Sequence, residues 1–213
     1  MQIYDLSHPI ASGMPVFPGT PNPIVIPIAS LNKDGFLEHC LSLSTHTGTH
    51  VDAPAHVLPQ GKSIDVLPCE AFCGSACVLD CRQARDGCIT LEFLEDLDCL
   101  ANPVDFVLMY TGWDGFWGQK GYYSGFPILT FEAANWLAGF PLKGVGVDTP
   151  SIDPVDSLDL AAHHALLENE ILIIENLTNL DRLPGEGCTF CCLPLYLEHG
   201  DGSPVRAVGI VGA

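Results

Sequence analysis

Three histidines and one aspartate lie within eleven residues of the chain, at His46, His50, Asp52 and His56. The residues between the first two histidines, Thr-Gly-Thr, are poor helix formers, so we expect a turn that leaves a strand. An extended backbone then points His50 and Asp52 to the same side. Imidazole and carboxylate groups are the ligands that zinc and manganese prefer. The pattern predicts a divalent metal site, and the alternative is a polar loop that happens to be rich in histidine.

A site with only three protein ligands has open coordination positions, which are typical of catalytic rather than structural zinc. Two later segments offer further ligands: the adjacent pair His163 and His164, and Glu175. Glu175 directly follows the apolar run 171–174, and a carboxylate at the end of a buried strand is costly unless it is paired or binds a metal. The alternatives are a histidine pair on a helix surface and an exposed strand end at Glu175.

The elements that must hold these residues are mostly short strands. Apolar or alternating runs predict strands over residues 2–6, 36–44, 76–81, 104–110, 143–148, 171–174, 189–195 and 204–211. Apolar residues at helical spacing predict helices over residues 90–100, 130–137 and 158–168. Six prolines between residues 9 and 27 predict an extended loop with a definite course. This order predicts one α/β domain over residues 1–213, with a mixed sheet and about three helices.

The composition excludes several kinds of partner. The chain carries 26 acidic and 8 basic residues, for a net charge of -18, so nucleic acid and anionic membrane surfaces would be repelled. Its apolar runs fall short of the ~20 residues that a membrane span requires. Residues 1–9 show no signal-peptide pattern, so we expect a cytoplasmic protein without membrane or nucleic-acid contacts.

Ten cysteines are present, and four of them, Cys69, Cys73, Cys77 and Cys81, recur at every fourth residue. This spacing differs from the C-x2-C knuckles that are typical of structural metal sites. On the expected strand 76–81, Cys77 and Cys81 share one face, and cysteine is a small, readily buried residue. We therefore expect reduced, inert thiols in the core, with an iron–sulfur or zinc site as the alternative.

Segment 46–56 resembles the H-x-G-T-H-x-D-x-P-x-H motif of the metal-dependent cyclase family, which includes bacterial kynurenine formamidases and isatin hydrolases. Residues 4–7 resemble the family's opening strand and residues 15–19 its substrate loop, and residues 146–153 and 203–207 are similar to later family blocks. The resemblance implies a swivelling β/β/α fold and a hydrolase that acts on the C–N bond of a small-molecule amide.

By motif, the resemblance also implies a binuclear site with two divalent metal ions, with zinc as the first expectation and manganese as the alternative. The metal ligands carried over are His46, His50, Asp52, His163 and Glu175. The two motif histidines would hold the first metal, His163 would hold the second, and the two carboxylates would bridge them. The family spacing of twelve residues between histidine and bridging glutamate selects His163 over His164.

His56 matches the family's acid/base residue. In the implied mechanism a metal-bound hydroxide attacks the amide carbonyl, and His56 accepts a proton and returns it to the departing amine. Phe17 stands in the substrate loop where kynurenine formamidases carry tryptophan, and is expected to contact the substrate.

N-formylkynurenine is the leading substrate that the resemblance implies. Isatin, or another cyclic amide or ester, is the alternative, and a non-catalytic metal-binding protein on the same fold is a third hypothesis. Family members bring a neighbouring subunit close to the active site, so the resemblance also implies a homo-oligomer, a dimer or a tetramer, with loop 9–27 at the subunit boundary.

Overall fold

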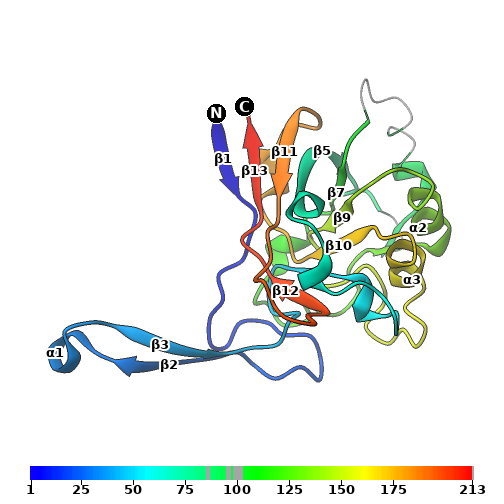
Figure 1. Ribbon diagram of the computed structural model, residues 1–213. Helices are drawn as coiled ribbons and strands as arrows, with labels where there is room; N and C mark the ends of the chain where they lie inside the picture. The colour runs from blue at the N-terminus through cyan, green and yellow to red at the C-terminus, as the bar shows by residue number, and fades with distance from the viewer. Residues whose placement is uncertain (85–86, 95–96, 98–102, 213) are drawn as a thin grey trace.

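A nine-stranded mixed sheet forms the centre of the computed structural model, which describes residues 1–84, 87–94, 97 and 103–212 (Figure 1). The strand order is β1-β13-β11-β5-β7-β9-β10-β4-β12. The strand bounds are β1 (Gln2–Asp5), β4 (His50–Asp52), β5 (Cys73–Asp80), β7 (Phe106–Tyr110), β9 (Gly144–Val147), β10 (Leu172–Glu175), β11 (Cys188–Cys191), β12 (Gly202–Pro204) and β13 (Val208–Val211). Strands β5, β7, β9 and β10 run parallel, and the strands on both sides of them pair antiparallel. The predicted mixed α/β fold is confirmed.

The central strands are buried on both faces, as their sequences predict. Residues 106–109 of β7 are fully buried, which is typical of a parallel strand covered on both sides. Its neighbour β9 contains Gly144 and Gly146, and a Cβ atom added at Gly146 would lie 2.7 Å from Leu108 and from Leu177. The glycine therefore lets large apolar side chains from β7 and from the segment after β10 close over β9.

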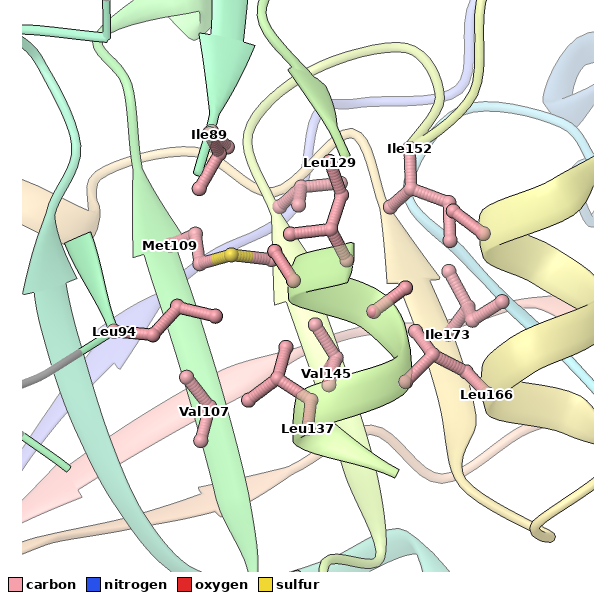
Figure 2. Packing of buried hydrophobic residues seen from close by; sticks show 14 of the residues in the cluster. Ile89, Leu94, Val107, Met109, Leu129, Leu137, Val145, Ile152, Leu166 and Ile173 are labelled. Carbon is pink, nitrogen blue, oxygen red and sulfur yellow. The ribbon is translucent and has the colours of Figure 1, made fainter. Parts of the chain in front are cut away.

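Helices α2 (Phe131–Leu137) and α3 (Ala161–Leu167) cover one face of the sheet. Helix α2 begins as predicted, because the side chain of Thr130 accepts a hydrogen bond from the amide of Ala133. Figure 2 shows how this face packs, with Val107, Met109, Val145 and Ile173 of the sheet against Leu137 and Leu166 of the two helices. Each fully buried side chain of this size stabilises the fold by about 1.5–3 kcal/mol.

The remaining elements lie outside the main sheet. Strands β2 (Ile24–Ala29) and β3 (Glu38–Ser42) form an antiparallel arm that projects from the body, with α1 (Leu31–Asp34) at its tip (Figure 1). Strands β6 (Cys88–Ile89) and β8 (Ile128–Leu129) pair with each other. Short 3-10 turns are η1 (Pro54–His56), η2 (Ile64–Val66), η3 (Cys69–Phe72), η5 (Leu91–Phe93), η7 (Trp113–Phe116) and η8 (Leu180–Arg182). No helix among the described residues is long and apolar enough to cross a membrane.

Several predicted elements differ in extent. The predicted strand 204–211 is two strands, β12 and β13, and the predicted loop 9–27 already enters β2 at Ile24. The helix predicted over 158–168 is α3, which begins three residues later because Leu160 adopts a left-handed conformation with φ of 45°. Of the helix predicted over 90–100, residues 91–93 form a 3-10 turn, and residues 95–96 and 98–100 lie outside the described part of the chain.

The cysteine prediction is wrong for Cys73, which forms a disulfide, and for Cys69, which is exposed; it is confirmed for Cys77 and Cys81. Cys73 and Cys191 form a disulfide, because the antiparallel register of β5 and β11 places them opposite each other with Cα atoms 4.3 Å apart. Cys77 and Cys81 are buried free thiols on one face of β5, as expected. Burial raises the pKa of each of these two thiols to about 12, so both are protonated and unreactive at neutral pH.

Candidate metal-dependent active site

The pairing of β4 with β10 brings three of the site residues together. In the antiparallel pair β4–β10, Glu175 lies opposite His50, and Asp52 lies opposite Ile173. Side chains of residues two apart point to one face of a strand, so His50, Asp52 and Glu175 all emerge on the helix-covered face of the sheet. All three are buried. The spacing of two residues therefore places His50 and Asp52 on the same side of the strand, as the sequence predicts.

Helix α3 places a second imidazole over these residues. His163 is buried, and its Nε2 lies 3.4 Å from Glu175 Oε1 and 3.7 Å from Asp52 Oδ2. Its Nδ1 lies 2.6 Å from Asp153 Oδ2, and the same carboxylate accepts hydrogen bonds from the backbone amides of Ala162 and His163. Asp153 therefore fixes the first turn of the helix and the ring together. The neighbouring His164 points outward, with its side chain 40% exposed.

The rings of His50 and His46 are also held by hydrogen bonds of their ring nitrogens. Nδ1 of His50 lies 2.8 Å from the carbonyl oxygen of Gly48, which adopts a left-handed φ of 65° in the turn before the strand. A carbonyl oxygen only accepts, so Nδ1 carries the hydrogen and Nε2 is free to bind a ligand. His46 Nε2 lies 2.9 Å from Asp201 Oδ2, and its Nδ1 lies 2.6 Å from Asp52 Oδ1.

This arrangement fits one or more divalent cations. Nε2 of His50 lies 3.3 Å from Asp52 and 3.5 Å from Glu175. Together with the contacts of His46 and His163, three imidazoles surround these two carboxylates. Oδ2 of Asp52 is buried and has no hydrogen-bond partner among the described residues. A buried carboxylate oxygen without a partner is costly, and a metal ion would satisfy it. Ligand atoms close enough to share an ion occur in two groups, His46–Asp52–His56 and His50–Asp52–Glu175.

The electrostatics of the site also favour a cation. Burial alone would lower the pKa of His46, but the charge and hydrogen bonds of Asp52 and Asp201 raise it to about 9. Burial likewise opposes the effect of Asp153 and Glu175 on His163, whose pKa is nevertheless raised to about 10. Without a metal, protons on these rings neutralise the carboxylates. A metal ion would replace those protons, so its binding releases them.

His56 lies at the rim of the same cluster. Its ring centroid is 4.1 Å from that of His46 and 5.8 Å from that of His163. Burial and the neighbouring histidines lower the pKa of His56 below its ordinary value of 6.5, against the pull of Asp52 and Glu175. His56 is therefore neutral at pH 7 and able to accept a proton.

The cluster forms the base of a cavity of about 360 Å³. Phe17 of the proline-rich loop and Tyr123 line its wall, with ring centroids 5.8 Å apart in an edge-to-face arrangement. Pro150, Pro154 and Leu160 supply further apolar surface. A cavity of this size with a few polar groups at its base is typical of small-molecule sites.

The structure brings the predicted residues His46, His50, Asp52, His56, His163, Glu175 and Phe17 to this one cavity. Sequence reasoning missed the groups that hold them, notably Asp153, Asp201 and Tyr123. Asp153 stands in a segment that resembles the family, and Asp201 comes just before another, but a carboxylate 155 residues from His46 gives no local signal. Only the pairing of β12 with β4 brings Asp201 to the site.

Comparisons with known proteins agree with this geometry. Residues 4–154 match the family model described as putative cyclase. A kynurenine formamidase of Salinibacter ruber is 36% identical over 210 residues, which cover 98% of this chain and 97% of that protein. The chain belongs to the cyclase family.

Solved structures similar to this cyclase-family chain support the same assignment. An isatin hydrolase A of Labrenzia aggregata superposes with a TM-score of 0.88 at 29% identity, covering 100% of this chain and 94% of that one. A potential metal-dependent hydrolase with cyclase activity superposes with a TM-score of 0.80 at 27% identity, covering 98% and 96%. The chain is a metal-dependent amide hydrolase with the fold of the isatin hydrolases.

Proposed function

We propose that this enzyme is an arylformamidase that hydrolyses N-formylkynurenine to kynurenine and formate. The observation that carries the proposal is the convergence of three imidazoles and two carboxylates at the base of a cavity with an aromatic wall. The kynurenine formamidase from Salinibacter ruber, at 36% identity over nearly the whole chain, supports this choice of substrate.

The proposed cofactor is a pair of divalent ions, zinc first and manganese second, held by His46, His50, Asp52, His163 and Glu175. The orphaned Oδ2 of Asp52 and the buried carboxylate of Glu175 support this proposal, because divalent ions would satisfy carboxylate oxygens that are costly to bury. When bound, the ions supply a nucleophilic water at neutral pH and polarise the carbonyl.

His56 is the proposed acid/base residue. Because its pKa is lowered, its ring is neutral at pH 7 and accepts a proton as water adds to the formyl carbon. When the C–N bond breaks, the imidazolium returns that proton to the departing aryl amine. Phe17 and Tyr123 are proposed to hold the aromatic ring of the substrate against the cavity wall.

The alternative substrate is a cyclic amide such as isatin. The overlay with the isatin hydrolase of Labrenzia aggregata favours it, as does Phe17 in place of the tryptophan expected in a kynurenine formamidase. Phenylalanine offers a smaller stacking face than tryptophan and no indole N–H, so it can stack on an aromatic ring but donates no hydrogen bond to the substrate.

The test is turnover of N-formylkynurenine and of isatin by the zinc-loaded enzyme, with a His56→Gln variant. We expect faster turnover of N-formylkynurenine, and a kcat lowered about 10²–10⁴-fold in His56→Gln with the metal content unchanged. The matched control is His164→Gln, which changes an exposed histidine on α3 and should retain full activity. Faster turnover of isatin would select the alternative substrate, and no turnover of either would support the non-catalytic hypothesis.

We also propose that the enzyme works as a homo-oligomer, a dimer or tetramer, in the cytoplasm. The arm formed by β2 and β3 supports this, because it projects from the body and carries exposed apolar side chains, including Ile24, Ile26 and Leu41 (Figure 1). The strand register places Ile24 and Ile26 on one face of the arm and Leu41 on the other, so both faces expose apolar side chains. Apolar surface exposed in this way is typical of a contact with another protein.

A further inference from the structure

Asp201 lies between two histidines that have different proposed roles. Its Oδ2 is 2.9 Å from Nε2 of His46, a proposed metal ligand, and 3.6 Å from Nδ1 of His56, the proposed acid/base residue. The two imidazole rings lie 4.1 Å apart, so one carboxylate oxygen faces both. One metal ligand and the acid/base residue thus share a neighbour that the family motif does not contain.

The backbone holds Asp201 firmly in this position. The amide of Ala53 donates a hydrogen bond of 2.9 Å to the carbonyl oxygen of Asp201. Next along the chain, Gly202 pairs with Asp52 in the β12–β4 ladder. The carboxylate is therefore placed by the strand that carries the metal motif, although its side chain is 42% exposed at the rim of the cavity.

The contacts of the histidine ring nitrogens indicate the role of the Asp201 carboxylate. A histidine that binds a metal through one nitrogen generally donates its other N–H to a carboxylate or carbonyl, which fixes the tautomer and the ring plane. His163 has Asp153 in that position and His50 has the carbonyl of Gly48. For His46 the partner is Asp201, and this contact leaves Nδ1 facing Asp52 and the metal cluster.

The same reasoning extends to His56. With Nδ1 turned towards Asp201, its Nε2 points away from the carboxylate. The separation of 3.6 Å exceeds a hydrogen bond, but it is short enough for the carboxylate to attract the His56 ring when that ring is protonated. A carboxylate that interacts with one ring nitrogen of a histidine orients the ring, so the other ring nitrogen is available for proton transfer.

We propose that Asp201 is a positioning residue shared by His46 and His56, which holds the first ring for metal binding and the second for proton transfer. This proposal rests on the proposed function, since it assigns a support to the acid/base residue of that reaction. It adds a residue from the C-terminal segment to a site otherwise described by its motif histidines.

The test compares Asp201→Ala and Asp201→Asn with the matched control Glu198→Gln, which removes an exposed carboxylate three residues away. Zinc affinity of the metal-free protein is measured by competition with a chromophoric chelator, and kcat and KM for N-formylkynurenine are measured at saturating zinc. We expect Asp201→Ala to weaken zinc binding about 10–100-fold and to lower kcat about tenfold with KM unchanged. Asp201→Asn keeps an acceptor oxygen and should recover part of both losses.

The outcomes separate the two halves of the proposal. Wild-type zinc affinity in Asp201→Ala overturns the role at His46, and a wild-type kcat at saturating zinc overturns the role at His56. A lower melting temperature with both values unchanged makes Asp201 a structural residue only and overturns the whole proposal. If the wild-type enzyme turns over no amide, the proposed function fails, while the zinc competition still decides the role at His46.

Discussion

Each of three histidines in the site uses one ring nitrogen as an anchor and offers the other to the cluster. The anchors are of two kinds, a backbone carbonyl for His50 and carboxylates for His46 and His163. Anchored rings lose little freedom when a metal binds, so the ligand geometry is set before the ion arrives. The types of ligand are readable from the sequence, whereas the anchors come from the fold.

Gly202 tests how tightly one of these rings is held. A Cβ atom added there would lie 2.7 Å from Cε1 of His46 and 2.9 Å from the carbonyl oxygen of Val51, too close for either to stay in place. We expect Gly202→Ala to displace the ring, to weaken zinc binding roughly tenfold and to cost about 1–3 kcal/mol of stability. Chelator competition and thermal unfolding measure both effects.

The matched control for that substitution is Gly115→Ala, where an added Cβ meets no atom within 4 Å and the backbone is not left-handed. It should bind zinc as the wild-type protein does. Wild-type zinc affinity in Gly202→Ala would show that His46 is free to move and would contradict the anchored-ring account.

At the scale of elements, the sequence predicts best where one physical effect dominates. The apolar runs around residues 104–110 and 171–174 predicted β7 and β10 because strands buried on both faces need continuous apolar sequence. Strand β2 of the arm was missed because Pro27 and the prolines upstream of it suggested a loop. A strand in a two-stranded arm tolerates proline, because on its free edge no further strand needs the backbone amide that proline lacks.

The candidate site was predictable in its residue types and not in its supports. The motif places His50 and Asp52 on one side of a strand, which β4 confirms. Three features of the structure depend on strand register: the pairing of Glu175 with His50, the disulfide between Cys73 and Cys191, and the contact of Asp201 with His46. Register is a property of the whole sheet, so residues far apart in sequence carry no local sign of it.

At the scale of the whole molecule, the projecting arm and the net charge of -18 act in opposite directions on association. Like charge keeps copies of the chain apart, whereas the exposed apolar arm favours a contact that buries it. A specific interface at the arm is compatible with both effects, because it buries the apolar side chains while the remaining charged surface still repels non-specific contacts.

Charged residues on the arm should therefore dissociate the proposed oligomer. Light scattering should give the wild-type enzyme a mass that is a multiple of the 22.8 kDa chain. The double variant Ile26→Glu with Leu41→Glu should have the mass of one chain, because it adds a negative charge to each apolar face of the arm. Leu158→Glu, at a fully exposed leucine outside the arm, is the control and should keep the wild-type mass. A single-chain mass for the fully active wild-type enzyme would contradict the proposal.

The most direct test of the metal-dependent mechanism is the metal content of the enzyme purified without chelator, with turnover of N-formylkynurenine measured in parallel. The ligand set predicts two zinc or manganese ions per chain, with activity that is lost on chelation and restored when the metal is returned. A protein that holds no metal after reconstitution, or that keeps full activity after the metal is removed, would contradict the account.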